Sequence, residues 1–215
     1  MAKLKKAQIP ELIEMMGKLY PEAECALVHE DRFQLLVAVV LSAQTTDKSV
    51  NQITPVLFER YPDAAALALA ETDDLEAILK RIGMYRTKAK NIIALSQMLM
   101  EKHDGQVPGD YDLLTELPGV GRKTANVVLS VGFGEPRIAV DTHVFRLANR
   151  IGLTSEKNVL NTELSLMKVI PKERWIMMHH ALIWHGRQVC IARKPKCDQC
   201  AIHTICRKNN VEEKA

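Results

Sequence analysis

The spacing of the cysteines constrains the fold of this chain more than any other feature of its sequence. Four of the five lie within 17 residues near the C-terminal end, at Cys190, Cys197, Cys200 and Cys206, whereas Cys25 stands alone. An odd number of cysteines with four crowded together indicates metal or cluster ligation rather than a disulfide framework. Structural zinc sites commonly use two closely spaced pairs, and only Cys197 and Cys200 form one here. The 6-2-5 spacing therefore favours a [4Fe–4S] cluster and leaves zinc open.

The rest of the chain is patterned for helices. Apolar residues recur at helical intervals, and no convincing run alternates apolar and polar residues as a strand does. Caps and breakers predict helices at 10–19, 33–42 (capped by Asp31), 47–58 (capped by Asp47), 64–70, 72–82, 85–102, 110 or 111 to 117, 122–133, 142–150, 160–169 and 173–187. We therefore predict an all-α fold in which short turns hide any domain boundary.

The composition is that of an ordinary globular protein. The 215 residues suffice for one large or two small domains, and only 5% of them are aromatic, which favours helix over sheet. No apolar run reaches the roughly 20 residues needed to cross a bilayer, and no signal-peptide core follows the basic N-terminus. We therefore expect a protein of the reducing cytoplasm. A net charge of +3 is too small to indicate nucleic-acid binding, so the placement of the basic residues must decide.

A glycine-containing turn joins two of the predicted helices. Its sequence is Leu117-Pro118-Gly119-Val120-Gly121-Arg122-Lys123-Thr124-Ala125. Two glycines allow a very tight turn and remove side chains that would keep a ligand from the backbone. The amides that follow lie at the start of a helix, where free N–H groups and the helix dipole favour a phosphate. The turn is typical of a helix–hairpin–helix that binds the DNA backbone, although an ordinary Pro-Gly connection between helices fits it too.

The stretch Val140–Arg146 places a carboxylate at a predicted helix start. By itself, Asp141 or Thr142 is simply an N-cap. The helix dipole and nearby amides also favour the charged carboxylate, which suits a residue that faces a developing cation. Asp141 follows Lys123 by 18 residues, so one helix and a turn would be enough to bring the two together.

The gap between the first two clustered cysteines is basic. It contains Arg193, Lys194 and Lys196. A solvated loop explains these charges, but a loop pinned at both ends by a cluster would also present them to phosphates. We therefore treat the three residues as candidate DNA contacts.

Together these motifs resemble those of the endonuclease III family. The resemblance rests on the hairpin with its lysine, the stretch Val140–Val144, the 6-2-5 cysteine spacing and a fourth motif, Leu41–Asp47. It runs in the family's order from about Arg32 to Cys206. Each motif alone is moderately specific, and the four together are very specific.

The resemblance implies two helical domains with a DNA-binding cleft between them. Residues 25–135 would form a helical barrel that carries the helix–hairpin–helix. Residues 1–24 and 136–215 would form a discontinuous domain with a [4Fe–4S] cluster in its C-terminal loop. We expect a monomer that binds double-stranded DNA containing a damaged base or an abasic site. We expect it to bind no membrane and to lie in the cytoplasm, associated with the nucleoid through its DNA binding.

The resemblance also assigns roles to single residues. Lys123 matches the family's catalytic lysine and Asp141 its catalytic aspartate. The lysine would expel an oxidised pyrimidine, form an imine with the sugar and cut the strand by β-elimination. Gln44 and Met84 match positions that fill the gap left by an extruded nucleotide, where family members often have leucine in place of Met84. DNA contacts are implied for Gly119, Val120, Gly121, Arg122, Arg193, Lys194 and Lys196, and cluster ligation for Cys190, Cys197, Cys200 and Cys206.

Four other classes of protein share some of these motifs. An iron–sulfur glycosylase acting on adenine opposite oxidised guanine would lack the lysine and carry a large extra C-terminal domain, whereas only nine residues follow Cys206 here. A thymine-mismatch glycosylase is excluded less firmly. A non-enzymatic hairpin module would leave Lys123 and Asp141 without a paired role, and a plain zinc-binding structural protein fits less well still.

The remaining candidate residues are expected to pack rather than react. Cys25 is predicted to be a core cysteine. His179, His180 and His185 lie among apolar residues of a C-terminal helix and are predicted to be core or surface histidines. His143 has two equally good interpretations, one in the cleft and one as a helix-cap or packing residue.

Overall fold

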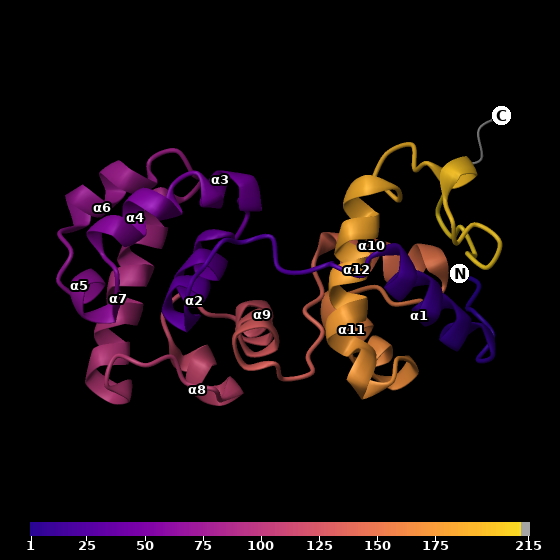
Figure 1. The fold of residues 1–215 in the computed structure, drawn as a ribbon, viewed down its shortest axis with the longest axis horizontal. Helices are drawn as coiled ribbons and strands as arrows, with labels where there is room; N and C mark the ends of the chain where they lie inside the picture. The colour runs from indigo at the N-terminus through magenta and orange to yellow at the C-terminus, as the bar shows by residue number, and fades with distance from the viewer. Residues whose placement is uncertain (212–215) are drawn as a thin grey trace. The chain divides into compact units, whose positions relative to one another are not determined.

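The regular structure of the chain is helical. A computed structural model describes residues 1–211, and the sequence of elements can be followed by colour in Figure 1. The α-helices of this described part are α1 (Gln8–Leu19), α2 (Arg32–Leu41), α3 (Asp47–Asn51), α4 (Thr54–Arg60), α5 (Ala64–Ala68), α6 (Thr72–Leu79), α7 (Tyr85–His103), α8 (Tyr111–Glu116), α9 (Arg122–Phe133), α10 (Thr142–Ile151), α11 (Val159–Val169) and α12 (Trp175–Gln188). Two 3-10 turns, η1 (Lys172–Arg174) and η2 (Cys197–Gln199), complete the order. The all-α prediction is confirmed.

The chain divides into two compact units. The hairpin unit is the continuous segment Cys25–Glu135, and the cysteine unit combines Met1–Glu24 with the chain from Pro136 onward. Each unit has its own hydrophobic core. No helix within residues 1–211 has the length and apolarity needed to span a membrane.

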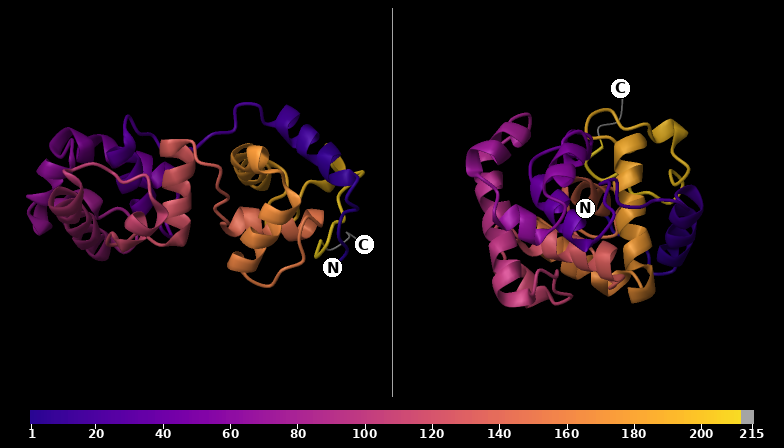
Figure 2. Two further views of the ribbon diagram at one scale, coloured as in Figure 1. Left: turned by 90° about the horizontal axis from the view of Figure 1, so that it is seen from below. Right: turned by 60° about the vertical axis from the view of Figure 1, so that its left-hand side comes forward.

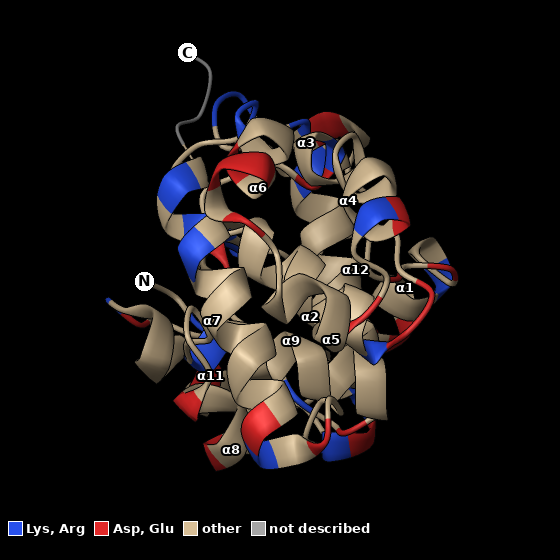
Figure 3. Ribbon diagram, turned by 90° about the vertical axis from the view of Figure 1, so that its left-hand side faces the viewer, with Lys and Arg blue, Asp and Glu red and all other residues tan. Residues whose placement is uncertain are grey.

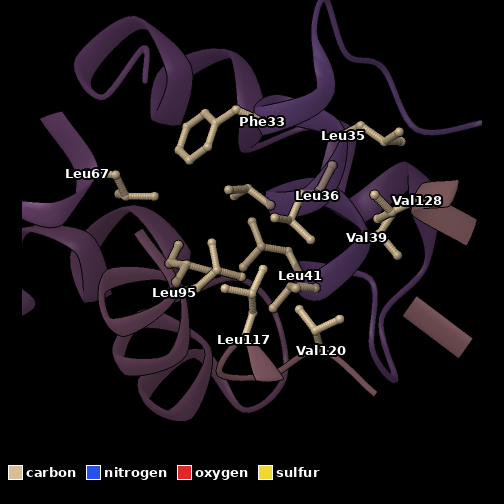
Figure 4. Packing of buried hydrophobic residues seen from close by; sticks show 14 of the residues in the cluster. Phe33, Leu35, Leu36, Val39, Leu41, Leu67, Leu95, Leu117, Val120 and Val128 are labelled. Carbon is tan, nitrogen blue, oxygen red and sulfur yellow. The ribbon is translucent and has the colours of Figure 1, made fainter. Parts of the chain in front are cut away.

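The core of the hairpin unit is built around α2. All but two of its residues are buried, and its ribbon is almost free of charged residues, as Figure 3 shows. Asp31 caps it as predicted, with its Oδ1 accepting a hydrogen bond from the Gln34 amide at 2.8 Å. Apolar side chains from other helices of the unit and from the turn between α8 and α9 gather around α2, and Figure 4 labels Leu67, Leu95, Leu117, Val120 and Val128 among them.

The predicted helix 47–58 is wrong in two respects. Thr46, not Asp47, is the N-cap, since the Thr46 Oγ1 accepts a hydrogen bond from the Ser49 amide at 3.2 Å. The chain also breaks after α3 and starts again as α4, whose first turn contains Pro55. Proline lacks an N–H and its ring clashes with the carbonyl four residues earlier, so it is tolerated only where a helix begins.

The cysteine unit packs α1 and α10 against α12. Its N-terminal and C-terminal segments lie side by side, as Figure 2 shows in indigo and yellow. The Asn209 side chain donates to the Ala2 carbonyl at 2.8 Å, and the Arg207 Nε donates to the Lys3 carbonyl at 3.2 Å. The last helix was predicted from about Glu173, whereas η1 occupies that position and α12 begins two residues later, at Trp175.

Candidate functional site

The predicted hairpin turn connects α8 to α9 and is anchored in the core. Leu117 and Val120 are buried, and Figure 4 shows them beside Leu41. The Val120 amide donates to the Leu117 carbonyl at 3.0 Å, which closes the turn. Gly119 has φ +80°, and a Cβ added to it would lie 3.0 Å from the Asn91 side chain. The positive φ therefore favours glycine at this position, and a larger residue would also crowd the Asn91 side chain.

The start of α9 is open to an anion. Gly121 is its N-cap, and no side chain among the described residues caps this helix end. The first amides of a helix have no partner inside it, and the helix dipole makes this end positive. Arg122 and Lys123 occupy the first turn with exposed side chains. Arg122 lies over the Tyr111 ring with its guanidinium carbon 5.8 Å from the ring centroid, so its cation stays near the turn.

Asp141 is the N-cap of α10 in the cysteine unit. Its Oδ1 accepts a hydrogen bond from the Val144 amide at 2.7 Å, and the residue is half-buried. This hydrogen bond fixes the carboxylate at the positive end of the helix and leaves its second oxygen for another partner. Two residues on, the His143 Nδ1 lies 3.2 Å from the Arg146 guanidinium, which supports the packing interpretation of His143.

Gln44 and Met84 occupy exposed turns of the hairpin unit. Both have left-handed backbone conformations, with φ +53° and +58°, which are uncommon for residues other than glycine. Met84 is 56% exposed, although it is a large apolar residue. Strained, exposed positions of this kind concentrate at functional sites.

The four clustered cysteines line one cavity of the cysteine unit. Within residues 1–211, no three His, Cys, Asp or Glu side chains converge closely enough to hold a single metal ion. Burial raises the pKa of the Cys200 and Cys206 thiols, so a positively charged group is needed to hold them as thiolates. Four cysteines spread around a common space suit a polynuclear cluster better than one zinc ion.

Side chains from two helices support this cavity. The His185 Nε2 lies 3.5 Å from the Cys200 Sγ, and the Tyr20 hydroxyl lies 2.8 Å from the His185 Nδ1. Burial lowers the pKa of His185 to about 4, and burial together with Cys200 raises the pKa of Tyr20 to about 12. A neutral imidazole and a protonated phenol fit a relay in which Tyr20 donates to His185 and His185 donates to the sulfur. Sequence reasoning placed His185 among ordinary core or surface histidines and missed this contact.

The basic segment between Cys190 and Cys197 is an exposed loop. Arg193, Lys194 and Lys196 all present exposed side chains. Arg150, on α10, donates hydrogen bonds to the Ile191 and Ala192 carbonyls of the loop at 2.8 Å each. The cations thus project from a backbone that is fixed by another helix.

The residues that were predicted to pack are found in contact with a core or buried. Cys25 packs against the core of the hairpin unit, as expected. His179, His180 and His185 are all buried, and the first two stack edge to face with ring centroids 4.8 Å apart. Arg146 was missed, although it donates to the Cys190 carbonyl at 2.9 Å and so ties α10 to the cysteine loop.

Comparison with known proteins gives a consistent picture. Residues 37–172 match the family described as HhH-GPD superfamily base excision DNA repair protein. The chain is 48% identical to an endonuclease III of Bacillus subtilis over 208 residues, covering 96% of this chain and 95% of the relative. It is 45% identical to an endonuclease III of Escherichia coli over 203 residues, covering 94% and 96%.

Solved structures agree with these relatives. A trapped endonuclease III–DNA covalent intermediate, an estranged-adenine complex, superposes with a TM-score of 0.91 at 49% identity, covering 95% of this chain and 97% of the other. A thermostable thymine-DNA glycosylase superposes with a TM-score of 0.84 at 22% identity, covering 94% and 96%. The second likeness shows a shared fold only.

Proposed function

Because the chain belongs to the endonuclease III family within the HhH-GPD superfamily of base excision DNA repair proteins, we propose that it is a bifunctional DNA glycosylase and abasic-site lyase. Its substrate is double-stranded DNA that contains an oxidised pyrimidine or an abasic site. The observation that carries the proposal is the exposed Lys123 in the first turn of α9, at a helix start without a side-chain cap and beside a turn in which Gly119 has a positive φ.

Lys123 is the proposed nucleophile. The hairpin amides bind a phosphate of the backbone, which brings the sugar of an extruded nucleotide within reach of the amine. The uncharged amine attacks C1′, and the bond to the damaged base breaks with the electron pair leaving on the base. The nitrogen lone pair then opens the sugar ring, because the C1′–O4′ bond breaks and O4′ takes up a proton, and C1′ is left as an imine to Lys123. Removal of a C2′ proton then expels the 3′ phosphate by β-elimination, which cuts the strand.

Asp141 is the proposed electrostatic partner of this step. As the glycosidic bond breaks, positive charge develops on the sugar, and a fixed carboxylate stabilises it. The same carboxylate accepts a proton from the lysine before attack. The N-cap hydrogen bond from the Val144 amide supports this role, because it orients the carboxylate before DNA arrives.

The DNA contacts come from three places. Gly119, Val120, Gly121 and Arg122 bind the backbone at the hairpin, and Gln44 and Met84 fill the space left by the extruded nucleotide. Apolar side chains commonly act as such wedges, which suits the exposed Met84. The basic loop adds Arg193, Lys194 and Lys196 as phosphate contacts.

The cofactor is proposed to be a [4Fe–4S] cluster ligated by Cys190, Cys197, Cys200 and Cys206. The shared cavity and the absence of a single-ion site within residues 1–211 support it. When bound, the cluster supplies four iron–thiolate bonds that fix the basic loop. We place the protein in the cytoplasm as a monomer associated with the nucleoid, where its DNA substrate lies.

A variant of Asp141 tests the proposal. On a duplex with one thymine glycol, the wild-type protein should release the base and cut the strand. Asp141→Asn should lower base release by orders of magnitude yet still nick a duplex whose base is already missing, because no glycosidic bond remains to break there. Asp63→Asn is a matched control, since Asp63 is another N-cap aspartate, with its Oδ1 2.8 Å from the Ala66 amide.

Comparing the activities on different duplexes shows whether the proposed roles and substrate class hold. Equal loss on both substrates in Asp141→Asn would mean that the residue only holds the fold or the DNA. Release of thymine from a G·T mismatch in preference to oxidised pyrimidines would replace the proposed substrate class.

A further inference from the structure

One buried cation of the hairpin unit has no part in the chemistry proposed above. Lys88, on α7, is 4% exposed, and its Nζ donates to the Thr45 Oγ1 at 2.6 Å. Burial lowers the pKa of its ammonium group, and no carboxylate among the described residues forms an ion pair with it. Burying a cation with a single neutral acceptor is unfavourable, so the position calls for an explanation other than stability.

The hydrogen bond joins the two strained turns. Thr45 directly follows Gln44, and Lys88 lies one helical turn after Met84, with its amide donating to the Met84 carbonyl at 3.0 Å. Each left-handed residue other than glycine costs roughly 1–2 kcal/mol and persists only where its surroundings hold it. The Lys88–Thr45 bond is a direct side-chain link between the segments that hold Gln44 and Met84.

We infer that Lys88 is a positioning residue that fixes the spacing of Gln44 and Met84, so that both enter the DNA together when a nucleotide is extruded. This inference rests on the proposed function. Ordering the two turns in the free protein removes an entropic cost that would otherwise fall on the extrusion step. Without the Lys88–Thr45 hydrogen bond each turn still folds, but the spacing between the Gln44 and Met84 side chains is no longer fixed.

Replacing Lys88 with an uncharged residue of similar size separates a positioning role from a packing role. A methionine of similar length would fill the same buried space without a charge to desolvate. Lys88→Met should therefore unfold at a temperature equal to or above that of the wild type. Thr45→Val should unfold at a lower temperature, because it leaves the ammonium group without its acceptor. The double variant should regain the loss.

The rate of base release, which depends on nucleotide extrusion, should not follow the unfolding temperatures of these variants. In single-turnover assays on a thymine glycol duplex, Lys88→Met, Thr45→Val and the double variant should each release base about tenfold more slowly than the wild type, as expected for the loss of one charged hydrogen bond. The double variant should be no slower than the singles. A 2-aminopurine placed opposite a stable abasic analogue should show a smaller rise in fluorescence on binding in all three. Lys90→Met, which removes an exposed lysine two residues away on α7, is the matched control and should behave as the wild type.

Two results would overturn the inference. Wild-type rates and wild-type fluorescence in Lys88→Met would show that the bond does not position the wedge. Parallel losses of stability and base release in all three variants would show that Lys88 only packs. If the wild type itself released no damaged base, the proposed function would fail instead, and the fluorescence of the abasic duplex would still report on the link.

Discussion

The hairpin turn and the cysteine loop both present cations, but they are held in place by different means. The turn, residues 117–122, is anchored by Leu117 and Val120, which are 2% and 6% exposed in the core of the hairpin unit. The loop from Val189 to Val211 contains only η2 as a regular element and lies around the cavity lined by the four cysteines. Its basic segment is held by hydrogen bonds from Arg150, and only the later part of the loop is anchored by buried side chains, those of Ile202 and Ile205.

This difference shows how each region is specified. Apolar burial fixes the hairpin turn without any ligand, because the side chains that hold it are already in contact. The loop has Ile202 and Ile205 in the core of the cysteine unit, but its basic segment, residues 191–196, has no buried residue. The loop also gathers thiols whose charged forms are disfavoured until a cation binds them. We therefore expect the hairpin to be independent of the cluster and the loop to depend on it.

The largest effect should follow from removing a proposed cluster ligand. Cys197→Ser and Cys200→Ser should lose most of their iron and the visible absorption of the cluster, because a ligand and its share of the folding energy are gone. Cys25→Ser is the control and should keep both. Iron analysis of the purified variants measures the effect. Full iron content in the Cys197 and Cys200 variants would remove the basis for treating the loop as ligand-dependent.

Truncating the buried side chain of Leu117, which anchors the hairpin turn, should produce the next largest effect. Leu117→Ala should lower the free energy of unfolding by about 2–5 kcal/mol, because it leaves a cavity in the core. Leu113→Ala, on the exposed side of α8, should change it by about 0.5 kcal/mol or less. Urea unfolding followed by circular dichroism makes the comparison. Similar values for the two variants would mean that the turn is not held by burial.

A smaller effect is expected from alanine at Gly119, and a comparison with Gly134 separates backbone strain from crowding of a neighbouring side chain. Gly119→Ala and Gly134→Ala both place a Cβ at positive φ, which costs roughly 1–2 kcal/mol of stability. Only Gly119→Ala also pushes on the Asn91 side chain, since nothing lies within 4 Å of a Cβ at Gly134. We expect weaker binding to undamaged duplex for Gly119→Ala alone. Equal binding by the two variants would assign the glycine requirement to folding only.

Single charges should give the smallest effect. Neutralising Arg122, Arg193, Lys194 or Lys196 with glutamine should lower the slope of log affinity against log salt by about one unit each. Titrations on undamaged duplex at several salt concentrations provide the slopes. If iron is removed, the slope change for Arg122→Gln should remain and that for the three loop residues should shrink. Unchanged slopes in all four holoprotein variants would mean that these charges face only solvent.

The sequence predicted most helices because caps and breakers act locally. Asp31, Gly134 and Gly152 end or begin helices where the residue pattern places them. The break at Pro55 was missed because apolar residues keep a helical spacing across it, so periodicity masked the local signal.

The candidate site was predictable only where local chemistry dictates it. Gly119 was identified because a tight turn demands glycine. Lys88 and His185 were missed because their partners, Thr45 and Cys200, lie 43 and 15 residues away, and no local pattern reports such contacts. The left-handed conformation of Met84 was likewise not predicted, because no pattern in its sequence neighbourhood indicates it.

Trapping the covalent step on Lys123 tests the proposed mechanism directly. Borohydride reduces an imine to a stable amine, so a duplex with one thymine glycol should give a protein–DNA adduct when borohydride is present. Peptide mapping should place the adduct on Lys123, and Lys123→Gln should give neither adduct nor strand cut while still binding the duplex. If the wild-type protein releases the base but forms no adduct, water is the nucleophile and Lys123 only contacts phosphate.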